Sequence, residues 1–314
     1  MKYDFFSLRL LVVIFFIVHV TEADAQWFHS LVHKGEAFHI YEYDEDDPAE
    51  DTLRGFSFGL NLGGYFASAE TANFYNGTCP INGYINEAAQ MRCYTIVDRL
   101  DRSVFIQDGS YITNFYNATD YVFPNDTYPT NMRYNPAMYV GLQLKYNFNR
   151  YAAVVMNVNA LKLNATGQFT MRFLGTPQPL NAQGDIRLFS ITGSEQRMNL
   201  NLGFRQGWMM GDFSNFYLQF GGSMLATKWS NNQVNVAERS FDLITSAPFA
   251  GQTAVAVQAQ AGLGFGGFAA TGVEFWLGKY SFDIGFGLSR DKVKIFSYSK
   301  NVWNKMLQVT FALS

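Results

Sequence analysis

Charged side chains are scarce in this chain of 314 residues, and only one long apolar run is present. Asp, Glu, Lys and Arg make up 16% of the residues, whereas about 25% is usual for a soluble domain. The net charge of −3 and the lack of a basic stripe argue against a nucleic-acid-binding protein. Charged or strongly polar residues interrupt every later apolar stretch, which argues against a second spanning helix. Aromatic residues, at 17%, and 27 glycines are abundant instead, which favours strands that face lipid.

The N-terminus has the pattern of a secretory signal. Two basic residues lie at the start of the apolar run 10–18, and Ala23-Asp24-Ala25 fits the small-x-small rule of signal-peptidase cleavage. The run is roughly half as long as the ~20 apolar residues that a spanning helix needs. We therefore predict a signal peptide over 1–25 and an exported chain. Residues 26–54 lack the pattern of the later strands, and we expect them to form a periplasmic tether.

From about Gly55 onward the sequence pattern changes to a period of two, with large apolar residues at alternate positions. This period of two is typical of β-strands, whose successive side chains point to opposite faces. The opposite face carries Gly, Ser, Asn, Gln or a single charge. Eight segments follow the pattern clearly, namely 56–66, 138–147, 152–159, 198–205, 216–224, 273–277, 281–288 and 307–313.

The connections between these segments alternate between short and long. The short ones, each beside aromatic residues, are 148–151, 211–215 and 277–280, and the long ones are 67–135, 162–196, 227–260 and 290–302. Short periplasmic turns, long extracellular loops and aromatic residues at the lipid–water boundary are typical of outer-membrane barrels.

The sequence therefore predicts an all-β fold, an antiparallel transmembrane β-barrel over 55–314 in the bacterial outer membrane. The final strand can pair with the first and close the sheet. We expect eight strands. Residues 104–112 also read as a hairpin with an Asp-Gly turn, which would raise the number to ten if that hairpin joined the barrel.

Four charged residues fall on the inward face of the predicted strands, namely Lys145, Arg205, Glu274 and Asp283. Eight strands enclose an interior just wide enough for side chains, and an unpaired buried charge is costly. We therefore expect a paired charge network that fills the lumen. The only cysteines, Cys79 and Cys93, are predicted to form a disulfide, as is usual for one close pair in an exported chain.

Histidine is missing from the predicted barrel, since the last of the four histidines is His39. Barrel enzymes such as lipid A palmitoyltransferases, phospholipases and omptin proteases use a histidine, usually to activate a serine or a water. We therefore expect no catalytic centre, no cofactor and no metal site. Two alternatives are weaker: a metal held by His29, His33 and His39, and paired catalytic carboxylates at Glu274 and Asp283.

The first long connection, 67–135, greatly exceeds ordinary loop length and is rich in aromatic residues. Tyr and Asn in such quantity resemble a rigid, amphipathic contact surface. We predict that it docks other envelope proteins. The rings chosen as candidate contacts are Tyr94, Phe105, Tyr111, Phe115, Tyr116 and Tyr121. The alternative is that these rings build the loop's own small core.

The barrel pattern, the aromatic-flanked turns and the terminal strand resemble the small outer-membrane β-barrels of Bacteroidota, including PorT-like and PorG-like components of type IX secretion. The resemblance covers about Gly55 to Ser314. It implies a non-enzymatic barrel that is often a subunit of an envelope complex. We expect contacts with outer-membrane lipid, lipopolysaccharide and other envelope proteins. The alternative is a transport or ligand-binding barrel for a small molecule or glycan, which requires an open lumen.

Overall fold

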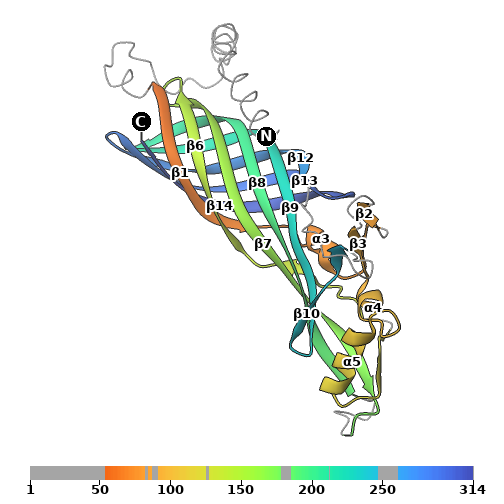
Figure 1. Ribbon diagram of the computed structural model, residues 1–314. Helices are drawn as coiled ribbons and strands as arrows, with labels where there is room; N and C mark the ends of the chain where they lie inside the picture. The colour runs from red at the N-terminus through yellow and green to blue at the C-terminus, as the bar shows by residue number, and fades with distance from the viewer. Residues whose placement is uncertain are drawn as a thin grey trace, which may run out of the picture. The chain divides into compact units, whose positions relative to one another are not determined.

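Eight strands form a closed ring in the computed structural model, which describes residues 54–81, 84–86, 91–124, 127–177, 185–211, 213–246 and 261–313 (Figure 1). The ring strands are β1 (Gly55–Phe66), β6 (Ala137–Asn147), β7 (Ala152–Leu174), β8 (Asp185–Gly211), β9 (Ser214–Val236), β12 (Gly262–Leu277), β13 (Tyr280–Ile295) and β14 (Tyr298–Leu313). Each pairs antiparallel with the next, and β14 pairs with β1 to close the ring. The predicted eight-stranded barrel is confirmed, and the ten-strand alternative is wrong.

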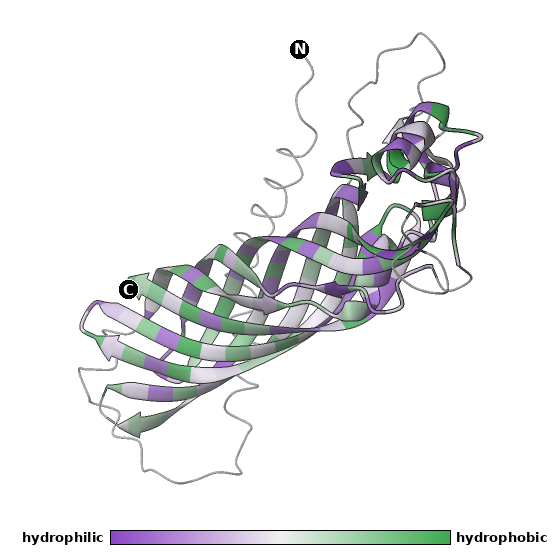
Figure 2. Cartoon of the chain, turned by 90° about the horizontal axis from the view of Figure 1, so that it is seen from below, coloured by the Kyte–Doolittle hydropathy of each residue, from purple (hydrophilic) through white to green (hydrophobic). Residues whose placement is uncertain are grey.

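Side chains along each ring strand alternate between the outside and the lumen, and Figure 2 shows the matching alternation of hydropathy. Leu142, Phe220 and Phe286 face outward and are 66%, 59% and 40% exposed, whereas Asn61 and Asn157 are buried in the lumen. A water-soluble core would show the reverse arrangement. Because ring closure also leaves no unpaired strand edge, this wall suits hydrocarbon and is that of a transmembrane barrel.

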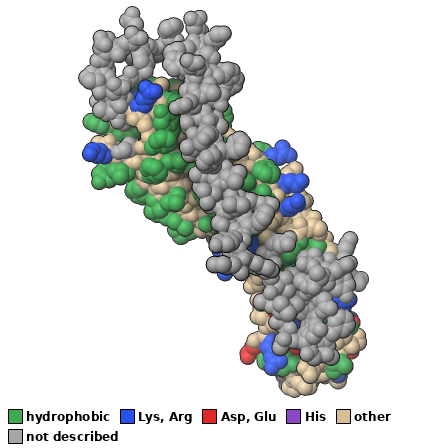
Figure 3. Space-filling model, turned by 45° about the horizontal axis from the view of Figure 1, so that its top comes forward, with side chains coloured by type: hydrophobic (Ala, Val, Ile, Leu, Met, Phe, Trp, Pro, Cys, Tyr) green, Lys and Arg blue, Asp and Glu red, His purple; other side chains and the backbone are tan. Residues whose placement is uncertain are grey.

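We call the outward-facing apolar residues of the eight strands the apolar belt. On β13 the belt consists of Tyr280, Phe282, Ile284, Phe286 and Leu288. Figure 3 shows, on one face of the molecule, apolar side chains gathered over the barrel wall with Lys and Arg side chains at the borders of that area.

The two ends of the barrel differ. At one end, which we call the turn end, short turns join β6 to β7, β8 to β9 and β12 to β13. Asn149 shapes the first turn because its side-chain oxygen accepts hydrogen bonds from the backbone N–H of Tyr151 and of Ala152, each at 2.8 Å. Gly278 supplies the positive φ that the third turn requires. By the usual orientation of outer-membrane barrels, the turn end is periplasmic and the opposite loop end is extracellular.

Several ring strands are longer at the loop end than the sequence predicts. β7 and β8 leave only 175–184 between them, so the predicted connection 162–196 is too long, and β9 runs to Val236. The predicted connection 290–302 is wrong, because β13 and β14 continue to a tight turn at 296–297.

The cause of this error is an inversion of the hydrophobic phase beyond the apolar belt. On β7, the outward positions become polar at Lys162 and Asn164, which are exposed. The inward positions Leu161 and Leu163 are buried. The period of two therefore persists after the strand leaves lipid, with the apolar side chains now turned inward.

The first long connection folds into a small module at the loop end. It contains α3 (Ala69–Ala72), η2 (Asn73–Tyr75), β2 (Tyr84–Asn86), β3 (Met91–Cys93), α4 (Ile96–Arg99), α5 (Ile106–Phe115), β4 (Asp120–Val122) and β5 (Arg133–Tyr134). Two strands of the β9–β12 connection, β10 (Arg239–Asp242) and β11 (Ile244–Ser246), lie with it, since β11 pairs with β3. We call the described residues of 67–135 and 237–246 the loop module. β4 and β5 pair with β7 and so attach this module to the ring.

The hairpin predicted over 104–112 is wrong, because α5 occupies most of this segment. The helix buries Gly109, Ile112 and Thr113, whose spacing places them on one helical face. A Cβ at Gly109 would lie 2.8 Å from the Arg102 side chain, so the glycine permits close packing rather than a turn. No helix in the part of the chain that the structure describes is long and apolar enough to cross a membrane.

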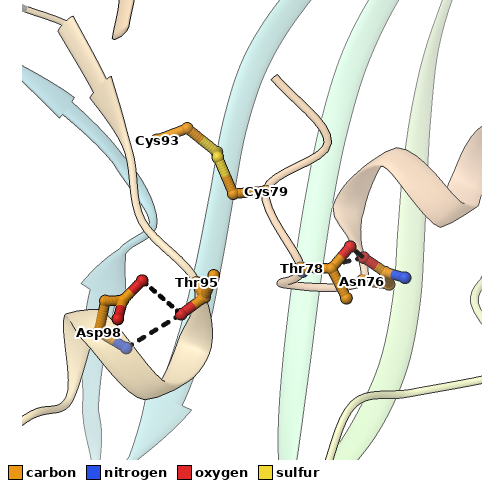
Figure 4. The surroundings of a disulfide bond; sticks show 6 residues. All are labelled: Asn76, Thr78, Cys79, Cys93, Thr95 and Asp98. Atoms are coloured by element: carbon orange, nitrogen blue, oxygen red, sulfur yellow. Dashed lines mark hydrogen bonds between the residues drawn. A yellow bond between two sulfur atoms is a disulfide. The ribbon is translucent and has the colours of Figure 1, made fainter. Parts of the chain in front are cut away.

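Cys79 and Cys93 form a disulfide that lies wholly within the loop module (Figure 4). Beside it, Thr95 caps α4, because its hydroxyl accepts from the Asp98 N–H at 3.0 Å and donates to the Asp98 carboxylate at 2.7 Å. β3, which ends at Cys93, pairs with β11. The disulfide therefore links the segment after η2 to the small sheet. A cross-link closing a loop of this length contributes about 3 kcal/mol in the chain-entropy model.

The predicted signal peptide 1–25 lies outside the described residues, as do His29, His33 and His39 and nearly all of the predicted tether 26–54.

Candidate functional site: the lumen and the loop module

The structure brings all four predicted lumen charges together near the turn end. Arg205 of β8 contacts both carboxylates, with Nη1 at 3.3 Å from Glu274 Oε2 and at 2.9 Å from Asp283 Oδ2. Lys145 of β6 pairs with Glu274 Oε1. The strand register places Glu274 opposite Asp283, so the two cations offset the repulsion between neighbouring carboxylates. No side chain of the four is more than 5% exposed, and the charges fill this level of the lumen.

Sequence reasoning missed the neutral partners of this network. Arg205 also donates to Gln219 Oε1, from Nε at 3.3 Å and Nη2 at 3.2 Å, and its guanidinium carbon lies 3.9 Å from the centroid of the Tyr217 ring. Both partners are buried on β9. The sequence does indicate that both side chains point inward, because they alternate with the large apolar residues of this strand. The pocket left beside Lys145, Arg205 and Glu274 has a volume of about 20 Å³, which is room for a single water.

Above the charges, a layer of amides joins four neighbouring strands. Asn61 Nδ2 lies 3.1 Å from Asn157 Oδ1 and 3.3 Å from Asn159 Oδ1, and Gln143 Nε2 donates to Asn157 Oδ1 at 3.1 Å. The Thr310 hydroxyl donates to Asn61 Oδ1 at 2.8 Å. These side chains are all buried, and their mutual hydrogen bonds stabilise a polar interior that lipid cannot solvate.

A buried carboxylate occupies the next level toward the loop end. Asp291 accepts hydrogen bonds from the hydroxyls of Ser223 and Ser289 and from Asn304 Nδ2, the last at 3.1 Å. Asn304 Oδ1 in turn accepts from the backbone N–H of Ser68 at 3.4 Å. The lumen network is therefore continuous with the first residues of the loop module.

A fully buried ion pair anchors the loop module in the barrel mouth. Arg197 Nε lies 2.6 Å from Glu195 Oε1, and neither side chain is exposed to solvent. Arg197 also donates to the Tyr65 hydroxyl at 3.3 Å and to Thr71 Oγ1 of α3 at 3.1 Å. Sequence reasoning missed this pair, because Glu195 falls in the connection 162–196 predicted to be a loop and Arg197 falls just before the predicted strand 198–205. Only a continuous strand places both side chains on one inward face.

Two module tyrosines complete the anchor. The hydroxyls of Tyr75 in η2 and Tyr134 in β5 donate to Glu195 Oε2 at 2.7 Å and 3.1 Å. Burial raises the pKa of both phenols well above the ordinary value, and the nearby Glu195 carboxylate raises them further. Both phenols are therefore protonated donors at any physiological pH, and Glu195 holds the two segments against the ring.

Most of the six rings predicted to contact a partner make internal contacts, within the loop module or against β7. Tyr121 is buried and donates to the Leu100 carbonyl, and Tyr116 packs on Phe173 with ring centroids 4.5 Å apart. Tyr111 donates to the Ala237 carbonyl at 2.9 Å. These contacts belong to a packed core that joins the loop module to β7, and contact of the six rings with a partner stays a prediction.

Tyr94 and Phe105 pack on each other, with ring centroids 5.5 Å apart, and both are only partly exposed. Among the six predicted rings, Phe115 is the large apolar residue that stays exposed, at 43%. Val104 and Ile106, at 63% and 66%, are more exposed than Phe115 and were not predicted. Nothing in the sequence marks these two residues as exposed, because they form a continuous apolar run with Phe105.

The barrel has a lumen filled with polar side chains, an apolar belt, and short turns with aromatic residues. Together these are the features of an outer-membrane β-barrel. In the described part of the chain, no group of three or more His, Cys, Asp or Glu residues is placed to hold a metal ion.

No family model matches the chain, and no curated protein matches its sequence. Three similar solved structures illustrate the architecture. Neisserial surface protein A has a TM-score of 0.39 and 8% identity, covering 82% of this chain and 96% of its own. The attachment invasion locus protein Ail of Yersinia pestis has a TM-score of 0.30 and 10% identity, covering 83% and 100%. The outer-membrane protease OmpT of Escherichia coli has a TM-score of 0.30 and 8% identity, covering 85% and 99%. At these values the likeness concerns the barrel architecture and not an activity.

Proposed function

We propose that this chain is a non-catalytic barrel of the bacterial outer membrane that docks other envelope proteins through its loop module. The observation that carries the proposal is the exposure of Val104, Ile106 and Phe115, which lie at the two ends of α5. Large apolar side chains that are exposed next to one another on a folded surface favour an interaction site. We call Val104 and Ile106, which are two residues apart and both more than 60% exposed, the apolar tip.

The internal contacts of the loop module support this role, because a preformed surface loses less conformational entropy when it binds. Next to the tip, Arg99 Nη1 lies 2.8 Å from Asp108 Oδ2, and its guanidinium carbon is 4.4 Å from the centroid of the Phe105 ring. These contacts hold the start of α5 against α4. The disulfide and the Glu195–Arg197 anchor fix the rest of the module.

The filled lumen argues against the transport alternative. Paired charges, an amide layer and the Asp291 cluster occupy successive levels, and the module packs into the mouth above them. A solute path would require these hydrogen bonds to separate, which leaves buried charges unpaired. The same arrangement supports a structural rather than catalytic role for Glu274 and Asp283, because both carboxylates are engaged by Arg205.

We propose further that the chain is a PorT-like or PorG-like barrel of a Bacteroidota-type envelope complex, related to secretion. The aromatic-flanked turns and the period-two terminal strand support this proposal. It includes export by the signal peptide 1–25 and removal of that segment.

The test is co-purification from native outer membranes with a tip variant. Ile106→Glu places a charge on the apolar tip, and Gln107→Glu adds the same charge to the exposed neighbouring position as a matched control. We expect the wild-type chain and Gln107→Glu to recover the same partner chains and Ile106→Glu to lose them. Recovery of a free monomer from wild-type membranes in several mild detergents would refute docking. Steady conductance of the folded barrel in planar bilayers would favour transport instead.

A further inference from the structure

The charges of the ring strands are sorted by sign. Every acidic residue of the eight strands is buried, and the set is Asp185, Glu195, Glu274, Asp283 and Asp291. The charged residues that are exposed on these strands are all basic, namely Lys162, Arg172, Lys228, Arg290, Lys292, Lys294, Lys300 and Lys305. The outer wall therefore presents one sign of charge only.

The basic residues are concentrated on two adjacent strands. On β13 the outward positions after Leu288 are Arg290, Lys292 and Lys294, and all three are exposed. On β14 the register places Lys305 opposite Leu288. We call these four residues the basic ridge, namely Arg290, Lys292, Lys294 and Lys305. In the part of the chain that the structure describes, none of them forms an ion pair, whereas Lys300 pairs with Glu70 at 3.0 Å.

The height of the ridge on the wall matches the edge of the hydrocarbon. The belt residues of β13 run from Tyr280 to Leu288, a rise of about 26 Å along the strand at ~3.3 Å per residue. With the tilt usual for barrel strands, this length corresponds to about 20 Å along the membrane normal. The apolar band of an outer-membrane barrel is ~25 Å tall. Arg290, the next outward residue, therefore lies where lipid headgroups begin.

An aromatic ring and further apolar side chains border the ridge. Trp303, opposite Arg290 in the register, is 60% exposed, and the Arg290 guanidinium carbon lies 5.7 Å from its ring. Trp side chains favour the boundary between lipid and water. On the other side of β13, strand β12 carries the exposed residues Phe265 and Leu263. They lie beside the basic stretch of β13, because the adjacent Gly266 of β12 pairs with Asp291 of β13. Cationic and apolar groups thus lie side by side.

We propose that the outer face of β12, β13 and β14 is a binding site for a phosphorylated glycolipid of the outer leaflet. The basic ridge would hold its phosphate groups, and Phe265 and Leu263 would contact its acyl chains. Lys and Arg near a membrane surface attract anionic headgroups, and the Arg fork fits phosphate oxygens. The proposal rests on the outer-membrane location and outward-facing module of the proposed function, but not on docking of a protein.

The experiment measures binding of diphosphorylated lipid A to the full chain purified in detergent. The variant Arg290→Gln/Lys292→Gln/Lys294→Gln removes three ridge charges, and Lys162→Gln/Lys228→Gln removes outward charges from β7 and β9 as the control. We expect at least an approximately tenfold loss of affinity in the ridge variant and less than about a twofold loss in the control. The shift in gel migration between heated and unheated samples checks that each variant is folded.

Three results would overturn the proposal: equal affinity of wild type and ridge variant, equal binding of dephosphorylated lipid A, or full competition by inorganic phosphate, which indicates a free-anion site. Labelling of Gln107→Cys on intact cells tests the orientation separately. Absence of labelling at position 107 would contradict the proposed extracellular location of the loop module, whatever the lipid A result. Loss of partner chains in Ile106→Glu with unchanged lipid A affinity separates docking from lipid binding.

Discussion

Neutralising Glu195 should detach the loop module from the barrel mouth. Glu195→Gln keeps the size of the side chain and one acceptor oxygen, but it leaves the Arg197 guanidinium without a counter-charge. Both side chains are fully buried, so solvent cannot compensate. Removing one partner of a buried ion pair costs about 3–5 kcal/mol. We expect this cost to appear mainly as local opening of α3 and η2. Thr71 of α3 accepts a hydrogen bond from Arg197, and Tyr75 of η2 donates one to Glu195.

A double-mutant cycle separates the loss of the ion pair from general destabilisation of the module. Arg197→Met alone should cost a similar amount, because it leaves the Glu195 carboxylate buried and unpaired. The double variant Glu195→Gln/Arg197→Met should be closer to wild type than the sum of the singles, because no buried charge remains. Glu238→Gln, an exposed carboxylate in the same module, is the control, with an expected change below about 0.5 kcal/mol.

The assay is hydrogen exchange of backbone amides in lipid vesicles, comparing residues 69–75 with the ring strands. Faster exchange in 69–75 alone, in both single variants, is the expected pattern. A cost below about 1 kcal/mol for Glu195→Gln, or strictly additive single effects, would refute the anchoring role of the pair.

Three further perturbations should have separable effects. Cys79→Ser should loosen the loop module by about 3 kcal/mol and leave ring-strand exchange unchanged, because the bond lies within the module. Burial raises the pKa of Tyr121 to about 12, so the stability from its hydrogen bond is fully present below pH about 10 and is lost as the pH rises through the raised value. Near-ultraviolet absorbance should show this phenol ionising late and together with module opening. Tyr121→Phe should reduce the late step by one phenol, while Tyr75 and Tyr134, whose pKa values burial also raises, still contribute to it. Phe220→Arg should destabilise the barrel in lipid vesicles by about 2–4 kcal/mol in denaturant unfolding, and Phe220→Leu by less than about 1.5 kcal/mol. Equal stability of the arginine variant would mean that the wall does not face lipid.

The sequence predicts the membrane-spanning part of this fold well, because one physical rule governs it. Side chains that face hydrocarbon must be apolar, so large apolar residues alternate regularly with small or polar ones along each spanning strand. This period of two is clear from Phe216 to Met224 and from Phe282 to Leu288. The same rule identifies the inward charges, since a lone Lys145 or Arg205 among apolar neighbours has no other face to occupy. Their mutual distances follow from strand order and register, which the closed ring determines.

The rest of the candidate site could not be predicted from local patterns. Beyond the belt both faces change character, so the strand carrying Glu195 and Arg197 reads as a loop. The partners of this pair, Tyr75 and Tyr134, come from segments 120 and 61 residues away from Glu195. α5 shows the opposite problem, because its Asp-Gly dipeptide has a strong local turn preference that tertiary packing overrides.

The central claim is that the large apolar side chains of the ring face lipid while the polar ones fill the lumen. Single cysteines at Leu218, Phe220 and Met224, and at the inward Gln219 and Ser223, can carry a fluorophore in vesicles that contain a lipid-borne quencher. We expect strong quenching at the first three positions and weak quenching at the other two. Quenching without this alternation, or protection of the three apolar positions, would contradict the account.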